Sequence, residues 1–171
     1  MTAKSYDLTD GHEPMSHAEI DCLKALAVSL PPNPLIVNIG AATGVSTCAF
    51  LEARPDCFIF SVDTEPCDDE LEHAGRPRNL VRLLGDSKEI GCRFPYLADL
   101  VFVDGDHWNA AGDILAWLDK VKPGGIMAFH DYIVPPNPPE NPGDVYNQVN
   151  AGMGTYEQLT WVDRVVAYRC L

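Results

Sequence analysis

Two apolar runs that each end in acidic and histidine side chains constrain this 171-residue chain most strongly. The first is Leu100–Val103, followed by Asp-Gly-Asp-His at 104–107, and the second is Ile126–Phe129, followed by His-Asp at 130–131. A helical pattern separates them, so the two strands are expected to lie parallel. In an open parallel sheet, ligands bind beyond the carboxyl ends of the strands. We therefore expect both acidic clusters to open onto one cleft.

The rest of the chain continues this alternation. Further strands are predicted at residues 35–40, 58–63, 79–84, 158–162 and 165–170, and helices at 16–30, 45–53, 68–74, 109–122 and from about 144. The last two strands flank a tight turn at Asp163-Arg164 and should pair antiparallel. The pattern predicts an α/β fold, with a Rossmann-like, doubly wound, mostly parallel sheet of seven strands in the order 3-2-1-4-5-7-6 and strand seven antiparallel. Residues 16–171 are predicted to form one domain, and residues 1–15 a flexible extension.

Composition excludes several classes of protein. A net charge of −13 with no basic stripe argues against a nucleic-acid partner. The apolar runs are too short to span a bilayer, and residues 1–15 lack a signal-peptide pattern, so a cytoplasmic location without a membrane partner is expected. A homo-oligomer is left open. The six cysteines form no C-x-x-C pair and are expected to be reduced. Trp108 and Trp117 are expected to be packing residues.

A glycine loop and an acid point to an adenosine-type cofactor. Gly40–Gly44 follows the first strand and opens a helix, although many strand-to-helix turns need glycine without binding a ligand. Asp63 ends the second strand 23 residues after Gly40 (63 − 40 = 23), where an acid can accept hydrogen bonds from ribose hydroxyls. Asp86 and Ser87 follow the third strand. They either contact an adenine ring or cap a turn, and these alternatives stay open.

With these motifs, the chain resembles the class I S-adenosylmethionine-dependent methyltransferases. It is similar to small-molecule O-methyltransferases that carry D-G-D-H after strand four and H-D-Y after strand five, over residues 16–171. The resemblance implies methyl transfer from S-adenosylmethionine to a small-molecule acceptor through a hydroxyl oxygen. The cofactor-binding residues that it implies are Asn38, Gly40, Ala41, Ala42, Thr43, Gly44, Asp63, Thr64, Asp86, Ser87 and Asp104. Family members usually carry an acid at the position of Asn38. An amide brings no charge to pair with the cofactor's ammonium group, which favours weaker binding.

The resemblance also implies a metal site. Related catechol and sugar O-methyltransferases bind a divalent cation at the ends of strands four and five, and the matching positions are Asp104 and Asp131, with His130 adjacent. Oxygen ligands suit Mg²⁺, which would lower the pKa of an acceptor hydroxyl. His107 is then the leading general base, acting catalytically beside Asp104. A structural role at a strand end is the alternative for both histidines.

Three other classes of protein are alternatives. A nicotinamide-dependent oxidoreductase is disfavoured because Ala42 occupies the second glycine position of G-x-G-x-x-G and no separate substrate domain is present. A metal-dependent phosphohydrolase would need ligands from more than two strands. A non-catalytic adenosylmethionine-binding or scaffold protein of the same fold is favoured by Asn38 and by the lack of a long acceptor-binding insertion.

Overall fold

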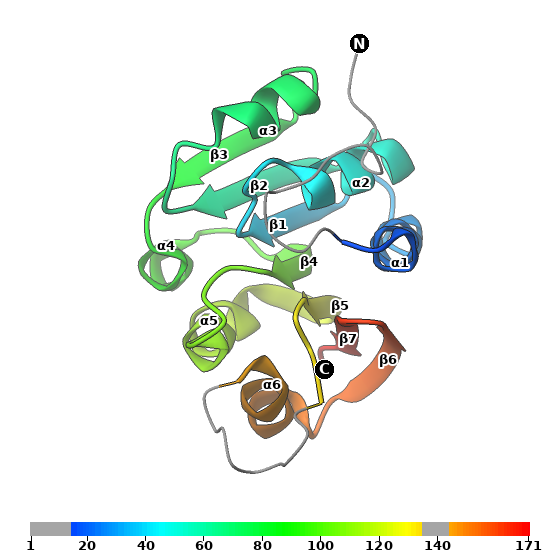
Figure 1. Cartoon of the computed structure of the whole chain (residues 1–171), viewed down its shortest axis with the longest axis vertical. Helices are drawn as coiled ribbons and strands as arrows, with labels where there is room; N and C mark the ends of the chain where they lie inside the picture. Colours follow the sequence, from blue (N-terminus) through cyan, green and yellow to red (C-terminus); the bar gives the residue numbers. More distant parts are fainter. Residues whose placement is uncertain (1–14, 135–143) are drawn as a thin grey trace.

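The computed structural model describes residues 15–134 and 144–171, and Figure 1 shows their arrangement. The strands are β1 (Leu35–Ile39), β2 (Phe58–Asp63), β3 (Leu80–Leu84), β4 (Ala98–Val103), β5 (Val121–Phe129), β6 (Glu157–Val162) and β7 (Val165–Arg169). The helices are α1 (His17–Val28), α2 (Val45–Ala53), α3 (Asp68–His73), α4 (Ser87–Arg93), α5 (Ala110–Trp117), the short 3-10 helix η2 (Leu118–Lys120) and α6 (Val145–Met153).

The seven strands form one sheet in the order β3-β2-β1-β4-β5-β7-β6. β1, β2, β3, β4 and β5 are parallel, whereas β7 runs antiparallel to both β5 and β6. The predicted fold class and strand order are therefore confirmed. Because β1 and β4 are neighbours, the loops that follow them lie side by side at the carboxyl edge of the sheet.

Helices cover both faces of the sheet because its central strands are apolar on both sides (Figure 1). In β4, Leu100 and Phe102 pack against the layer that contains α1 and α2. Val101 and Val103 point to the opposite face, in the layer that contains Trp117 of α5. The period-2 alternation of side chains along a strand thus builds two cores from one run of residues.

Three predicted details were wrong. The prediction contained no helix between the third and fourth strands, but α4 lies there, capped by Asp86. The helix predicted over 109–122 ends at Trp117, and Val121 instead starts β5 by pairing with Ala98. Trp117 is fully buried as predicted, but Trp108 is 78% exposed and is no packing residue.

Further predictions concern the N-terminal extension, membrane-spanning helices and the cysteines. The predicted extension lies outside the described residues, except for Met15, which is buried. Within the two described ranges, no helix is both long enough and apolar enough to cross a membrane. All six cysteines are free thiols in the structure, as predicted for reduced residues.

Candidate active site

A cavity of about 420 Å³ opens at the carboxyl ends of β1, β2, β3 and β4. Seven of the predicted cofactor-binding residues line it: Gly40, Ala42, Asp63, Thr64, Asp86, Ser87 and Asp104. Lys88, Gly105 and Asp106 also line it and were not predicted. The cavity is large enough for a nucleoside-sized ligand.

Gly40 brings the loop after β1 against the turn after β4. Its φ is 79°, a left-handed conformation that glycine adopts readily. A Cβ at this position would lie 2.1 Å from the carbonyl oxygen of Asp104, so no larger residue fits without backbone movement. The loop is therefore held beside the acidic turn at 104–106.

Asp63 ties the same loop to β2. Its Oδ2 accepts a hydrogen bond from the backbone N–H of Ala42 at 3.0 Å, and its Oδ1 accepts one from Glu65 at 3.0 Å. The carboxylate therefore shapes the wall of the cavity in addition to facing into it.

Asp86 takes the capping role that the sequence left open for Asp86 and Ser87. Asp86 accepts hydrogen bonds from the backbone N–H groups of Lys88 and Glu89 and so caps α4. The Ser87 hydroxyl donates to the buried Asp113 carboxylate. Both residues still line the cavity, so the capped turn presents them to a ligand.

Four predicted cofactor-binding residues do not line this cavity: Asn38, Ala41, Thr43 and Gly44. Asn38 is fully buried behind the loop, and its Nδ2 donates to Thr47 Oγ1 at 2.8 Å and to Ser46 Oγ at 3.0 Å. Thr47 in turn donates to the buried Glu70 at 2.5 Å. Asn38 therefore anchors the first turn of α2 from beneath.

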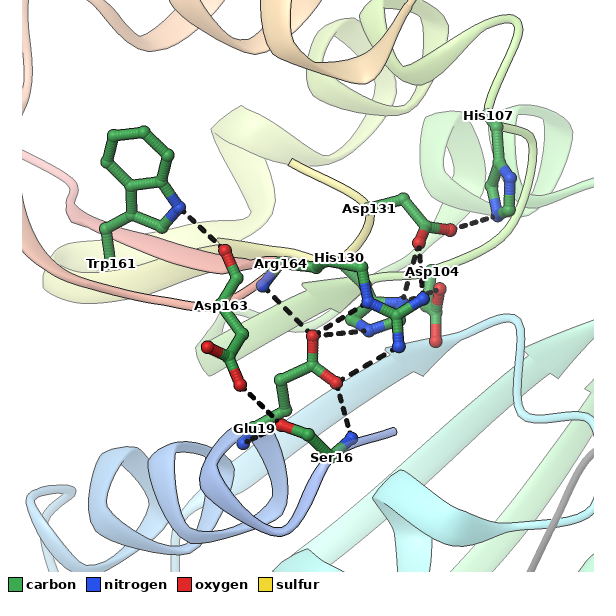
Figure 2. Close-up of polar contacts among 9 residues, drawn as sticks. All are labelled: Ser16, Glu19, Asp104, His107, His130, Asp131, Trp161, Asp163 and Arg164. Carbon is green, nitrogen blue, oxygen red and sulfur yellow. Dashed lines mark hydrogen bonds and ion pairs between the residues drawn. The ribbon is translucent and has the colours of Figure 1, made fainter. Parts of the chain in front are cut away.

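Beyond Asp104 lies a group of six ionisable residues that we call the charge cluster: Glu19, Asp104, His107, His130, Asp131 and Arg164 (Figure 2). His107 Nε2 lies 2.9 Å from Asp131 Oδ2. His130 Nδ1 lies 3.1 Å from Asp104 Oδ1 and 3.4 Å from Asp131 Oδ1. The fourth and fifth strands thus bring their terminal side chains together, as expected.

Charge compensation sets the protonation states in this cluster. Burial opposes a charge on His130, but its hydrogen bond to Asp104 and its close contacts with Asp131 and Glu19 outweigh it and raise the pKa of His130 to about 11. Burial likewise disfavours ionised Asp131, yet its bonds to His107 and His130 bring its pKa well below the usual range. The hydrogen bond to Asp131 raises the pKa of His107, against a smaller opposing effect of burial. His130 is therefore a cation at neutral pH.

The cluster contains a donor set that fits a divalent cation. One ligand atom from each of Asp104, His107 and Asp131 lies within 4.8 Å of the others. Carboxylate oxygens are the ligands that Mg²⁺ favours, and an imidazole nitrogen suits transition metals. His130 does not belong to this set, because one ring nitrogen faces Asp104 and the other lies 3.5 Å from Glu19.

Comparison with protein families identifies the family of this chain. A family model described as a methyltransferase domain matches residues 37–132, which is more than half of the chain. The chain belongs to this methyltransferase family. The match ends one residue after Asp131, so it includes both acidic strand ends but neither Glu19 nor Arg164. The comparison with curated proteins found no match.

Solved methyltransferase structures share the fold at low sequence identity. The N-methyltransferase NodS from Bradyrhizobium japonicum is 15% identical, with a TM-score of 0.70 over 93% of this chain and 98% of NodS. An O-methyltransferase family protein from Burkholderia thailandensis is 12% identical, with a TM-score of 0.67 over 88% of this chain and 54% of that protein. MycE from the mycinamycin biosynthetic pathway, in complex with Mg, SAH and mycinamycin VI, is 18% identical with a TM-score of 0.61. That alignment covers 80% of this chain but only 44% of MycE.

Two members of the charge cluster, Glu19 and Arg164, are not among the predicted site residues. The Ser16-x-x-Glu19 spacing has a local explanation, a capping box, which the structure contains: Ser16 and Glu19 cap each other across the first turn of α1. Arg164 was read only as a turn residue between the last two strands, where it does lie. Both residues have a sufficient local explanation, so the sequence gives no sign of a second, long-range role. Their contact across 145 positions could therefore not be predicted.

Proposed function

We propose that this chain transfers a methyl group from S-adenosylmethionine to a hydroxyl oxygen of a small-molecule acceptor. The observation that carries the proposal is the 2.9 Å contact between His107 and Asp131. His107 follows Asp104, which lines the cavity, in the same turn. A polarised histidine beside a nucleoside-sized cavity is what deprotonation of a hydroxyl next to a methyl donor requires. The family match and the complex of MycE with Mg and SAH support the same reaction class.

The cavity would hold the cofactor. Asp63 would accept hydrogen bonds from the ribose hydroxyls, and the capped turn at Asp86-Ser87 would face the adenine. The loop at 40–42 would hold the methionine end, because Gly40 lets its backbone approach closely. Asp104 lies at the far end of this wall, where the cavity meets the charge cluster.

His107 would act as the general base. Its Nε2–H donates to Asp131, while no residue drawn in Figure 2 contacts the other ring nitrogen, Nδ1, and the side chain is 55% exposed. Nδ1 takes the acceptor's hydroxyl proton as the oxygen attacks the methyl carbon. The carbon–sulfur bond breaks, its electron pair stays on sulfur, and the sulfonium becomes a neutral thioether. Asp131 stabilises the imidazolium that results.

Asp104 and Asp131 would hold a divalent cation beside His107, whose imidazole is kept for the proton transfer. A bound Mg²⁺ would lower the pKa of the acceptor hydroxyl and orient it. We leave His130 out of the ligand set because its two ring nitrogens face carboxylates, at 3.1 Å from Asp104 and 3.5 Å from Glu19. Residues 16–171 are proposed to act as a single catalytic domain.

Calorimetric titration with S-adenosylhomocysteine tests the cofactor site. Asp63→Ala removes charge-assisted hydrogen bonds and should weaken binding by roughly 10–100-fold. Asp68→Ala is the matched control, because Asp68 is an exposed acid on the adjacent helix that pairs with Arg82 outside this cavity. If Asp63→Ala binds as tightly as the parent protein, the cofactor assignment is wrong. Release of S-adenosylhomocysteine with a panel of hydroxylated acceptors then tests methyl transfer itself.

A further inference from the structure

A buried carboxylate on α1 reaches the back of the charge cluster. Glu19 has no exposed surface. Its Oε1 accepts hydrogen bonds from the backbone N–H of Arg164 at 3.0 Å and from Arg164 Nε at 2.9 Å, and its Oε2 accepts one from Nη2 at 3.2 Å. The same Oε1 lies 3.5 Å from His130 Nε2 (Figure 2). One carboxylate therefore faces two basic side chains that come from different strand ends.

Each of these two side chains also contacts a candidate catalytic carboxylate. His130 Nδ1 lies between Asp104 and Asp131, at 3.1 and 3.4 Å. Arg164 Nη1 donates to Asp131 Oδ1 at 3.4 Å. Among the described residues, Glu19 forms hydrogen bonds or ion pairs with Arg164 and His130 but with neither aspartate, so it acts on the aspartates through these two side chains.

Contacts with the side chain of Asp131 help to hold this residue in place, because its backbone conformation is strained. Its φ is 54°, a left-handed conformation that costs a non-glycine residue on the order of 1 kcal/mol. Arg164 and His130 hold Oδ1, which leaves Oδ2 pointing at His107. The orientation of the His107 contact therefore depends on what holds the opposite oxygen.

We propose that Glu19 and Arg164 are positioning residues for the Asp131–His107 pair. The inference rests on the proposed function, since it assigns these residues to the same site. Both lie outside the matched region 37–132, one on α1 and one in the β6–β7 turn. Helix α1 and the final hairpin thus supply the charges that orient the ends of β4 and β5.

The competing explanation is that Glu19 and Arg164 merely fasten α1 to the hairpin. Other contacts do this already: the Ser16 hydroxyl donates to Asp163 at 2.7 Å. A fastening role predicts a loss of stability without any change at His107. A positioning role predicts a change at His107 as well.

The experiment compares Arg164→Gln, Arg164→Lys and Glu19→Gln with the control Arg54→Gln. Arg54 also fastens α1, through the carbonyl groups of Ala27 and Leu30 and an ion pair with Asp56 at 2.8 Å, but outside the charge cluster. Histidine ring signals are recorded by nitrogen-15 NMR at one pH. His73, which contacts the Thr43 carbonyl, is an internal control in the same spectrum. The Arg164 variants keep the backbone N–H that donates to Glu19, so they retain one of its donors.

We expect Arg164→Gln and Glu19→Gln to shift the His107 signals and leave those of His73 in place. In turnover they should lower kcat by about 10–100-fold, with the dissociation constant for S-adenosylhomocysteine unchanged within about twofold. Arg164→Lys keeps the charge but loses the fork of donors, so part of kcat should return. Arg54→Gln should lower the melting temperature and leave His107 and kcat unchanged.

Unchanged His107 signals in both Arg164→Gln and Glu19→Gln would overturn the proposal, whatever their stability. Equal losses of kcat in Arg164→Gln and Arg54→Gln would overturn it too, because the effect would then follow from stability alone. If the parent protein transfers no methyl group, the proposed function fails, while the NMR comparison still decides whether Glu19 and Arg164 orient the pair.

Discussion

The cofactor cavity and the charge cluster lie next to each other but are built in different ways. The cavity is formed by the turns that directly follow β1, β2, β3 and β4, so each part of its wall is positioned by the strand that precedes it in sequence. The charge cluster also needs α1 and the β6–β7 turn, which lie near opposite ends of the chain. The cavity therefore depends on backbone shape, and the cluster on side chains that meet only after folding.

The two regions also handle charge differently. Acids in the cavity wall, such as Asp63 and Asp86, bond to backbone N–H groups of their own turns. In the cluster, the carboxylates of Glu19, Asp104 and Asp131 rely on His130 and Arg164 as counter-ions. Substitutions in the cavity should thus act through shape, whereas those in the cluster should act through charge. Four predictions test this contrast.

The largest effect is expected in the cluster, at His107. His107→Ala removes the proposed base and should lower kcat by roughly 10²–10⁴-fold, while S-adenosylhomocysteine binding changes little because His107 is not among the residues that line the cavity. Steady-state methyl transfer and calorimetry measure the two quantities.

Chelation separates the base from the metal in this prediction. EDTA should abolish methyl transfer and Mg²⁺ should restore it if Asp104 and Asp131 hold a cation. Full activity after chelation, with His107→Ala inactive, would refute the role of the metal and support His107 as the base. Full activity in both tests would refute the assignment of this cleft.

The second largest effect is expected in the cavity, at Gly40. Gly40→Ala places a Cβ 2.1 Å from the Asp104 carbonyl oxygen, so the loop must move away from β4. Cofactor affinity should fall by about 100-fold, equivalent to roughly 3 kcal/mol. Gly124→Ala is the matched control: Gly124 has a φ of 78°, but a Cβ there meets nothing within 4 Å. Equal affinity losses in the two variants would show that the close approach is unimportant.

This contrast explains what the sequence could predict. The strands and their order were predictable because each strand is a short apolar run whose ends carry turn residues. Cavity residues such as Gly40 and Asp63 follow from the same local pattern. Helix α4 was missed because its sequence SKEIGCR has little apolar periodicity. Its Gly91 instead packs tightly against Trp117, and Asp86 caps its start.

Long-range partners account for the rest. Glu19 and Arg164 meet only because α1 and the β6–β7 turn fold to the same edge of the sheet. Asn38 differs in another way: its position near the end of β1 matches the family pattern, but its side chain turns under the loop. Position along a strand could be predicted, whereas the environment of a buried polar side chain could not.

The third prediction concerns the pH dependence of stability. Burial opposes ionisation of Glu19, but hydrogen bonds from His130 and Arg164 outweigh it and lower the pKa of Glu19 to about 2 from 4.5. A depressed carboxyl pKa stabilises the fold fully above pH 4.5, and this contribution is lost as the pH falls towards 2. The stability difference between the parent protein and Glu19→Gln should therefore shrink over that window by on the order of 1–3 kcal/mol.

Urea unfolding at several pH values measures this difference. Glu72→Gln is the control, because Glu72 pairs with Arg76 at the surface, where both side chains are at least 65% exposed. It should change stability by less than about 1 kcal/mol. A difference between the parent protein and Glu19→Gln that stays constant from pH 5 to pH 2 would contradict a charge-based cluster.

The smallest effect on the site is expected at Asn38. Asn38→Asp restores the acid that related methyltransferases usually carry, so a residue facing the cofactor would bind more tightly after the change. In the structure the side chain lies behind the loop, where its Nδ2 donates to Thr47 and Ser46. Cofactor affinity should therefore change by less than about threefold.

Stability, in contrast, should fall in Asn38→Asp. A carboxylate cannot donate to Thr47, and the single Thr47 hydroxyl proton already goes to Glu70, whose pKa burial raises. The Ser46 hydroxyl, which donates to Asn38 Oδ1 at 3.2 Å, would still bond one carboxylate oxygen, but the other oxygen would have no donor on the Thr47 side of this buried site. The loss should cost roughly 1–3 kcal/mol. A tenfold gain in S-adenosylhomocysteine affinity would place Asn38 in the cavity after all and make the missing acid a real weakness of the cofactor site. Unchanged affinity with reduced stability would assign Asn38 to the support of α2 and remove the main argument for a non-catalytic scaffold.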